Sequence, residues 1–297
     1  MARLMGPPQE ENITMNILVT GANGQLGNSV RKIASNYTQH HFLYTDMPEV
    51  DITNLPLLED LVKRENIGAI INCAAFTAVD KAESSEELAA KINVDGPKNL
   101  AIAAKNVGAK LVHISTDYVF DGKSCLPLKE TDPTQPIGVY GKTKRQGEIE
   151  VEKTGCDAIV IRTAWLYSEY GNNFVKTMLS LGKERESLNV VYDQVGTPTF
   201  ATDLAYAIMT LLEKGFKGFN TYHFSNEGVI SWFDFTKAIF EIAGLQTKVN
   251  AIESFEYPTA AERPAYSVLN KRKIKAEGVN VPYWKDSLVQ CIKLLES

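Results

Sequence analysis

A glycine-rich segment stands between the first short hydrophobic run of the chain and a stretch with helical periodicity, and it restricts the fold more than any other feature. Its sequence is Gly-Ala-Asn-Gly-Gln-Leu-Gly at residues 21–27. In a strand-to-helix turn, Gly21 allows the tight turn, Gly24 lets the backbone approach a pyrophosphate, and Gly27 lets the helix pack against the strand. This placement predicts a βα unit that binds a dinucleotide, with the three glycines at the cofactor.

Short β-branched runs alternate with longer amphipathic stretches through the first half of the chain, as expected for a parallel sheet connected by helices. The predicted strands are residues 16–20, 41–45, 69–72, 110–115 and 158–162. The predicted helices are residues 25–35, 57–64, 84–106 and 140–152. Continuous runs such as Leu111-Val112-His113-Ile114 are typical of strands covered on both faces. The sequence therefore predicts an α/β fold with a Rossmann-like, doubly wound parallel sheet.

The second half of the chain alternates less regularly and is expected to interleave with the first. Its predicted helices are residues 173–181, 203–213, 232–243 and 284–295. We expect residues 15–165 to form the dinucleotide-binding core, and residues 166–297 to supply the remaining sheet strands and a small C-terminal substrate-binding cap. Residues 1–14 are expected to be a leader outside the fold. The Gly96-Pro97 pair should bend or interrupt its helix, because proline removes a backbone donor.

Charge and cysteine content exclude several classes of partner. The 297-residue chain has a net charge of -5 and a pI near 5.5, so it lacks the basic surface that nucleic acids require. Its four cysteines are far apart and form no CxxC pair, which makes a disulfide framework or a zinc knuckle unexpected. No hydrophobic run is long enough to span a bilayer, and residues 1–14 do not read as a signal peptide. We expect a cytoplasmic protein without nucleic-acid or membrane partners.

Asp46 is a candidate for recognising the ribose of a dinucleotide. It lies nineteen residues after Gly27, where the second predicted strand ends. An acid at about this separation commonly holds the hydroxyls of the adenine ribose. No arginine stands beside Asp46, and its carboxylate would repel a 2′-phosphate. We therefore expect NADH to be favoured, while a nearby loop could still admit NADPH; the alternative is a solvated acid at a strand end.

Tyr140 and Lys144 are four residues apart in a predicted helix, so their side chains lie on one face of it. The ammonium can stabilise a tyrosinate, lower the pKa of Tyr140 towards neutrality and donate to the nicotinamide ribose. Such a tyrosine can donate a proton to a carbonyl oxygen as hydride reaches the carbon. Thr116, which follows the fourth predicted strand, can place a hydroxyl beside the same oxygen. The three residues predict a carbonyl-reducing site at the carboxyl edge of the sheet.

Several further blocks make the chain resemble one enzyme family from Met15 to Trp284. The blocks are G-A-N-G-Q-L-G from Gly21, N-C-A-A-F-T-A-V-D-K-A-E from Asn72, S-T-D-Y-V-F-D-G from Ser115, Y-G-K-T-K from Tyr140, R-T-A-W-L-Y from Arg162, N-N-F-V from Asn172, D-Q-V-G-T-P-T from Asp193 and E-R-P-A-Y-S-V-L-N from Glu262. With them the chain resembles the dTDP-4-dehydrorhamnose reductases, which are extended short-chain dehydrogenases/reductases. The resemblance implies that NADH or NADPH reduces the C4 keto group of dTDP-4-dehydro-L-rhamnose to give dTDP-L-rhamnose.

The resemblance also implies roles for individual residues. Tyr140 would be the proton donor, Lys144 its partner, and Thr116 the residue that tunes it. The substrate sugar would contact Thr116, Asp117, Trp165 and Val79, with an apolar face of Trp165 lying on it. The implied cofactor contacts are Gln25 and Leu26 at the pyrophosphate, and Asp51, Ile52, Ala74, Ala75 and Thr77 along the rest of the molecule.

The sequence departs from the family pattern at two points, and the family's properties cannot be assigned to this chain there. Phe76 stands where many relatives have histidine, so a polar contact beside the cofactor is expected to be missing. Some members are described as metal-bridged dimers, but no full set of acidic ligands matches in this chain. The four histidines also lack metal-ligand spacing, and packing explains them. We therefore predict no metal-binding residues, and the sequence does not support bound Mg²⁺. Both a monomer and a homodimer are compatible with the sequence.

The sequence is also compatible with other functions of the same fold. A nucleotide-sugar 4,6-dehydratase would share the glycine turn and the Tyr-Lys pair, but it needs glutamate where Tyr118 stands. An epimerase or another nucleotide-sugar reductase is also an alternative. A regulatory module, such as the regulatory subunit of methionine adenosyltransferase, shares the fold without turnover. Such a module would tolerate loss of the catalytic residues, and this chain retains all three.

Overall fold

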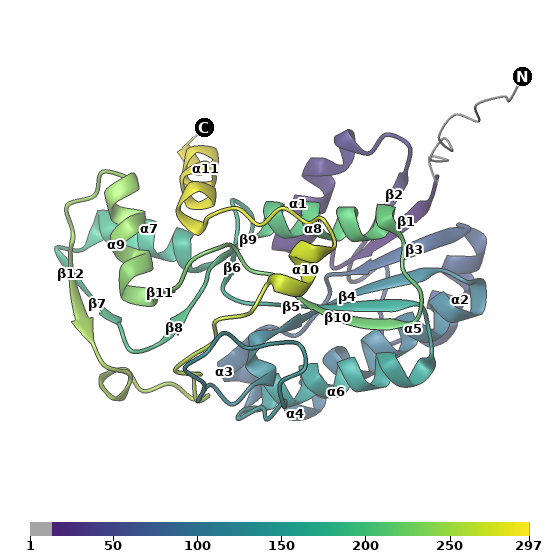
Figure 1. Ribbon diagram of the computed structural model, residues 1–297, viewed down its shortest axis with the longest axis horizontal. Helices are drawn as coiled ribbons and strands as arrows, with labels where there is room; N and C mark the ends of the chain where they lie inside the picture. The colour runs from purple at the N-terminus through teal and green to yellow at the C-terminus, as the bar shows by residue number, and fades with distance from the viewer. Residues whose placement is uncertain (1–13, 297) are drawn as a thin grey trace, which may run out of the picture.

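The centre of the computed structural model, which describes residues 14–296, is a six-stranded parallel sheet in the order β10-β5-β4-β3-β1-β2 (Figure 1). The strands are β1 (Asn16–Thr20), β2 (His41–Thr45), β3 (Ile67–Asn72), β4 (Lys110–Thr116), β5 (Ala158–Thr163) and β10 (Phe219–His223). The first two predicted strands are confirmed residue for residue, and the other three extend one or two residues further than predicted. The predicted leader, apart from Thr14, lies outside the described residues.

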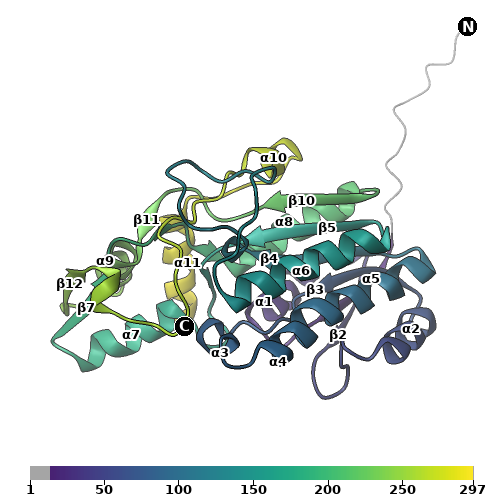
Figure 2. The ribbon, with the colours of Figure 1, turned by 90° about the horizontal axis from the view of Figure 1, so that it is seen from below.

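Alternate residues of the strands face two separate apolar layers, which explains why the strand sequences are hydrophobic throughout. Ile17 and Val19 of β1 belong to the core beneath one face, whereas Leu18 between them belongs to the core beneath the other. Helices α1 (Gln25–Ile33) and α8 (Ala201–Lys214) cover the first face. Helices α2 (Leu55–Arg64), α5 (Gly96–Val107) and α6 (Val139–Thr154) cover the second, and α5 and α6 lie in front of the sheet in Figure 2. The predicted doubly wound sheet is confirmed.

The strand order changes direction at β1, because the chain places β2 on one side of it and β3 on the other. In open parallel sheets, ligands bind outside the carboxyl ends of the strands at such a point. The fold therefore brings the β1–α1 turn and the loops after β2, β3 and β4 to one edge.

The predicted helix at residues 84–106 is interrupted, as the Gly96-Pro97 pair indicated. The chain forms α3 (Val79–Ala82), α4 (Glu86–Ala90), a π-helical segment (Lys91–Asp95) and α5. Pro97 has no N–H to donate to the carbonyl of Asn93, so the regular ladder cannot continue through this position. That carbonyl instead approaches α6 at Gly147, where a Cβ would stand 2.1 Å from the oxygen.

The second half of the chain forms a smaller lobe at the left of Figure 1. Helices α7 (Phe174–Glu184), α9 (Trp232–Ile242) and α11 (Trp284–Glu296) pack there beside the parallel pair β7 (Ser187–Val191) and β12 (Lys248–Ile252). The short elements of this half are β6 (Leu166–Tyr167), β8 (Val195–Gly196), β9 (Thr199–Phe200), β11 (Ile230–Ser231) and α10 (Arg272–Ala276). Strand β10 comes from the same half but pairs with β5 in the main sheet, so the two halves interleave.

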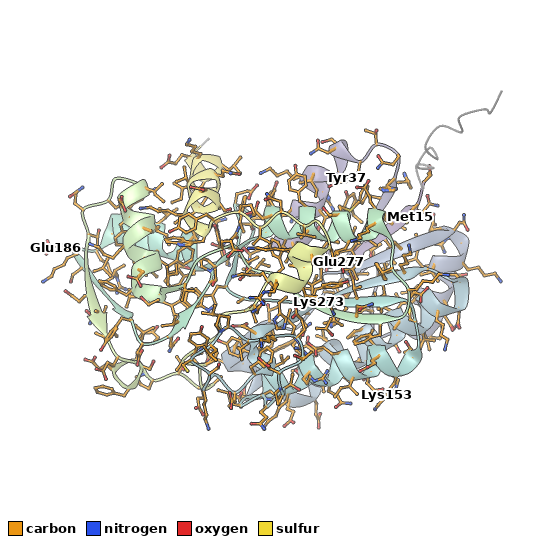
Figure 3. All side chains as sticks on the ribbon, viewed as in Figure 1. Met15, Tyr37, Lys153, Glu186, Lys273 and Glu277 are labelled. Atoms are coloured by element: carbon orange, nitrogen blue, oxygen red, sulfur yellow. The ribbon has the colours of Figure 1, made fainter. Side chains whose placement is uncertain are left out.

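Helix α10 fixes the outer strand β10 to the C-terminal segment. Lys273, labelled in Figure 3, donates to the carbonyl of Thr221 at 2.8 Å. Glu277, labelled beside it, accepts from the hydroxyl of Tyr222 at 3.0 Å. Over residues 14–296, no helix combines the length and apolar character needed to cross a bilayer.

Candidate active site

A cavity of about 920 Å³ opens at the carboxyl ends of the central strands, within the roughly 300 to 1,000 Å³ typical of ligand pockets. Its lining combines the β1–α1 turn, the loops after β2, β3 and β5, the end of β4 and the start of α6. The predicted site residues that line it are Gly21, Gly24, Gln25, Leu26, Asp46, Asp51, Ile52, Ala74, Ala75, Thr77, Val79, Thr116, Asp117, Tyr140, Lys144 and Trp165. The structure thus brings together every predicted site residue except Gly27.

The glycine turn leaves no room for side chains. Gly21 has a φ of +64°, and a Cβ on it would stand 2.6 Å from the backbone nitrogen of Ala74. Gly24 caps α1 without a side-chain hydrogen bond, and a helix N-terminus of this kind is a favourable position for a phosphate. Gly27 lies outside the cavity lining, where a Cβ would meet the Cα of Ala22 at 2.5 Å. Its contact is helix packing against the turn, so any influence on a cofactor is indirect.

Two carboxylates border the part of the cavity next to β2. Asp46 accepts hydrogen bonds from the backbone amides of Asn23 and Met47, each at 2.8 Å, and so joins the glycine turn to the end of β2. Asp51 accepts from the amide and hydroxyl of Thr53, also at 2.8 Å, and these bonds lower the pKa of its carboxyl. Asp51 therefore stays ionised at neutral pH.

The first turns of α6 place Tyr140 and Lys144 on the cavity because α6 packs tightly against the segment after β4. A Cβ on residue 141 would lie 2.1 Å from the carbonyl oxygen of Tyr118, so only glycine fits at this position, directly after Tyr140. The rings of Tyr118 and Tyr140 meet edge to face at 5.5 Å. The Lys144 ammonium is buried and donates to the carbonyl of Ile114 at 2.6 Å.

Burial dominates the proton affinities at the cavity. It raises the pKa of Tyr140 above its ordinary value, against a hydrogen bond with Thr116 that lowers it. The expectation that Lys144 lowers this pKa towards neutrality is therefore wrong, because burial, which disfavours the charged phenolate, is the largest effect on this group. Burial likewise lowers the pKa of Lys144 to about 8, opposed by the charge of Glu148. At neutral pH, Tyr140 is thus a neutral phenol, the form that donates a proton, and Lys144 is cationic.

Thr116 and Asp117 form a polar pair at the end of β4. The hydroxyl of Thr116 donates to one carboxylate oxygen of Asp117 at 2.9 Å, while the other oxygen is buried without a protein partner. Burial raises the pKa of Asp117 to about 6, and the hydrogen bond from Thr116 opposes this rise. An acceptor without a partner inside a cavity can be satisfied by a hydroxyl of a bound ligand.

Trp165 is held by an aromatic stack that sequence reasoning missed. Its φ is +48°, a strained conformation for a bulky residue. Its ring lies 3.6 Å from that of Trp232, with 13° between the planes. A Cβ on Gly196 would come within 2.8 Å of the Trp165 ring, so this glycine leaves the ring its space. The only sequence sign of Trp232 as a site residue was its aromatic character at the start of a helix.

Gln25 also has a role that its position in the glycine turn did not indicate. Its side-chain oxygen accepts from Ser168 at 3.1 Å and from Asn173 at 3.0 Å. These contacts join the turn to the segment after β6, which also lines the cavity. They span more than 140 residues of sequence, so residue spacing could not have revealed them.

Phe76 lies just outside the cavity lining and packs in a small apolar cluster with Val139 and Tyr140. Its backbone amide and carbonyl are both bonded to the side chain of Asn93 on the π-helical segment, at 2.9 and 3.1 Å. Within residues 14–296, histidine, cysteine, aspartate and glutamate side chains form no group of three or more that could hold a metal ion.

Fold and site together define an oxidoreductase of the short-chain dehydrogenase type, with a glycine-rich turn and a Tyr-Lys pair facing one cavity. The family model described as the RmlD substrate binding domain matches residues 15–297. A dTDP-4-dehydrorhamnose reductase from Aggregatibacter actinomycetemcomitans is 42% identical over 283 residues, which cover 92% of this chain and 96% of that protein. The chain belongs to the dTDP-4-dehydrorhamnose reductase family, as the sequence blocks predicted.

Solved structures agree with this assignment. The crystal structure of a dTDP-4-dehydrorhamnose reductase from Clostridium acetobutylicum has a TM-score of 0.91 and 44% identity, covering 95% of this chain and 100% of that one. The same enzyme from Bacillus anthracis, solved in complex with NADP, has a TM-score of 0.91 and 40% identity with the same coverage.

Proposed function

We propose that the protein reduces the C4 keto group of dTDP-4-dehydro-L-rhamnose to give dTDP-L-rhamnose, using NADH or NADPH. The observation that carries this proposal is the shared cavity, in which Tyr140, Lys144 and Thr116 lie at the same strand edge as the glycine turn. The names of the relatives support the substrate, and the retained Tyr-Lys pair supports an enzyme over a regulatory module. A sugar-nucleotide substrate also supports a cytoplasmic location.

The cavity residues divide into a cofactor side and a sugar side. The glycine turn and the loops after β2 and β3 would hold the nicotinamide dinucleotide, which supplies a hydride when bound. The missing Cβ atoms of Gly21 and Gly24 leave the backbone open to a pyrophosphate at the start of α1. Residues 15–165 would therefore bind the cofactor, and residues 166–297 would close over the sugar. Asp46 favours NADH, while the NADP complex of the Bacillus anthracis relative supports acceptance of NADPH.

The protein's own groups then account for the proton. Tyr140 would donate its phenolic proton to the C4 oxygen, and the hydroxyl of Thr116 would share that oxygen. The cationic Lys144 would stabilise the tyrosinate left behind and hold the nicotinamide ribose. Asp117, with one carboxylate oxygen free of protein partners, would accept from a sugar hydroxyl. Trp165 and Val79 would provide the apolar contacts of the sugar ring.

An assay with the purified protein tests the proposed reaction. We expect NADH and NADPH each to lose their nicotinamide absorbance when dTDP-4-dehydro-L-rhamnose is added, with dTDP-L-rhamnose as the product by NMR. A folded protein that binds a cofactor but leaves both absorbances unchanged would contradict the proposal.

Replacing Trp232 by leucine should raise the KM for the sugar nucleotide about two- to tenfold while changing kcat little. The stacked pair holds Trp165 in its strained conformation, and an aromatic pair contributes about 0.5 to 1.5 kcal/mol. Steady-state kinetics measure the effect on KM. Near-ultraviolet circular dichroism should report the loss of the stacked indoles in the same sample.

Phe174→Leu is the matched control, because Phe174 packs against Trp232 at 4.5 Å but lies outside the cavity lining. It removes a comparable aromatic contact and leaves Trp165 stacked. An unchanged KM in Trp232→Leu, or an equal rise in both variants, would show that the stack does not position the sugar platform.

A further inference from the structure

A row of buried polar side chains leads from Lys144 away from the cavity and into the sheet. The Lys144 Nζ lies 3.5 Å from Nε2 of His113 on β4. The other imidazole nitrogen, Nδ1, lies 3.0 Å from Nδ2 of Asn72, the last residue of β3. His113 is 0% exposed, Asn72 1% and Lys144 2%. Polar groups in such a position require defined partners, because an unsatisfied one is costly.

The orientation of the Asn72 amide follows from its other contacts. Its Oδ1 lies 3.1 Å from the backbone nitrogen of Ala74 and 2.8 Å from the hydroxyl of Thr20. A backbone N–H can only donate, so the atom facing Ala74 must be the amide oxygen. The NH₂ group of Asn72 therefore points at His113 and donates to it.

This orientation fixes the tautomer of His113. Burial and the nearby charge of Lys144 hold the pKa of His113 well below its ordinary value, so the imidazole is neutral. A neutral imidazole has one N–H donor and one bare acceptor nitrogen. Because Nδ1 accepts from Asn72, Nε2 must carry the hydrogen. The N–H of His113 thus faces the Lys144 nitrogen, where it disfavours an ammonium and suits a neutral amine.

We propose that Asn72 and His113 are positioning residues that control how readily Lys144 gives up its proton, and so set the alkaline limit of turnover. The pair would act through Lys144 and contact neither cofactor nor substrate, since neither side chain lines the cavity. The consequence for turnover rests on the proposed reductase function, but the tautomer and the protonation of Lys144 do not.

Other ionisable groups line the same cavity as Lys144 or act on its charge. They are Tyr140 and Glu148 on α6, Asp117 and Tyr118 after β4, Lys91 on the π-helical segment, Cys73 after β3, and Asp46 and Asp51 near β2. Burial opposes the ammonium and Glu148 favours it. In the proposed tautomer the N–H of His113 opposes it as well. With a pKa of about 8, Lys144 is cationic below that pH and loses its charge as the pH rises through it.

The substitution Asn72→Asp reverses the donor and acceptor roles in the hydrogen bonds that run from residue 72 through His113 to Lys144. A carboxylate keeps the acceptor for Ala74 and Thr20 but has no N–H for His113, so the imidazole must carry its hydrogen on Nδ1. Its Nε2 then becomes an acceptor for the ammonium. We expect the alkaline midpoint of kcat/KM to move up by about one pH unit or more, as for a lysine that gains an opposite charge nearby.

Thr20→Val is the matched control. It removes the other hydrogen bond to the Asn72 oxygen, but the Ala74 amide still fixes the orientation of that side chain. We expect this variant to keep the alkaline midpoint of the wild type. Equal midpoints in Asn72→Asp and Thr20→Val would overturn the proposal.

NMR tests the tautomer without turnover, so its outcome is separate from that of the reductase assay. Long-range proton–nitrogen correlation spectra of the wild-type protein should give His113 the pattern of a neutral Nε2–H imidazole. In Asn72→Asp the hydrogen should move to Nδ1. An Nδ1–H tautomer in the wild type would overturn the proposal, and this result decides it even if the variant does not fold.

Discussion

Replacing Tyr140 by phenylalanine should lower kcat by about a hundred- to ten-thousandfold, the usual contribution of a positioned proton donor. The substitution removes only the phenolic hydroxyl and leaves the ring that meets Tyr118 in place. Because the cofactor would be held mainly by the glycine turn and Lys144, its affinity should change little. Steady-state kinetics and a fluorescence titration with NADPH measure the two quantities separately.

Tyr44→Phe provides the control for the loss of a buried tyrosine hydroxyl. Tyr44 lies on β2 outside the cavity lining, and its hydroxyl is buried without a protein partner. The kcat of the Tyr44→Phe variant should match that of the wild type. A Tyr140→Phe protein that folds and turns over at the wild-type rate would remove Tyr140 from the proposed mechanism.

Replacing Glu148 by alanine should lower the free energy of unfolding by about 3 to 5 kcal/mol, because it leaves a buried arginine without its partner. Glu148 accepts from Arg162 at 2.9 and 2.8 Å and from Arg145 at 2.9 Å. Its carboxylate is fully buried, and Arg162 is 3% exposed. Urea unfolding of the variant and the wild type measures the difference. Loss of this charge should also make Lys144 deprotonate at a lower pH.

The control for this stability prediction lies half a turn further along α6. Glu150 pairs with Lys98 and Lys153, both of which are exposed to solvent. Pairs of this kind typically contribute less than about 1 kcal/mol, so Glu150→Ala should be nearly neutral. Similar unfolding free energies for Glu148→Ala and Glu150→Ala would contradict the importance of the buried pair.

The sequence predicted the sheet well because its strands are buried on both faces. Runs such as residues 16–20 and 41–45 are bounded by turn residues, and their ends match the structure. Helix ends were less accurate, since capping depends on tertiary contacts. The interruption near Pro97 could be predicted because a missing donor breaks a helix in any context. The π-helical segment before it was not predicted; there the Asn93 carbonyl lies against α6 at Gly147, a contact between segments far apart in the sequence.

The candidate site was predictable where residues follow strand ends, because parallel strands bring those ends to one edge. Thr116 after β4 and the glycine turn after β1 are examples. The contacts between distant segments were not predictable from spacing, as the Trp165–Trp232 stack illustrates. The pKa of Tyr140 was predicted with the wrong sign, because residue spacing gives the neighbouring cation but not the depth of burial. His113 was attributed to packing for the same reason.

The most direct test of the proposed mechanism is a crystal structure of the protein with NADPH and dTDP-L-rhamnose bound together. The mechanism predicts the Tyr140 hydroxyl oxygen within about 2.6 to 3.2 Å of the C4 oxygen of the sugar. It also predicts the Lys144 ammonium at the nicotinamide ribose. A sugar bound with its C4 oxygen away from Tyr140, or outside the cavity at the strand ends, would contradict the mechanism.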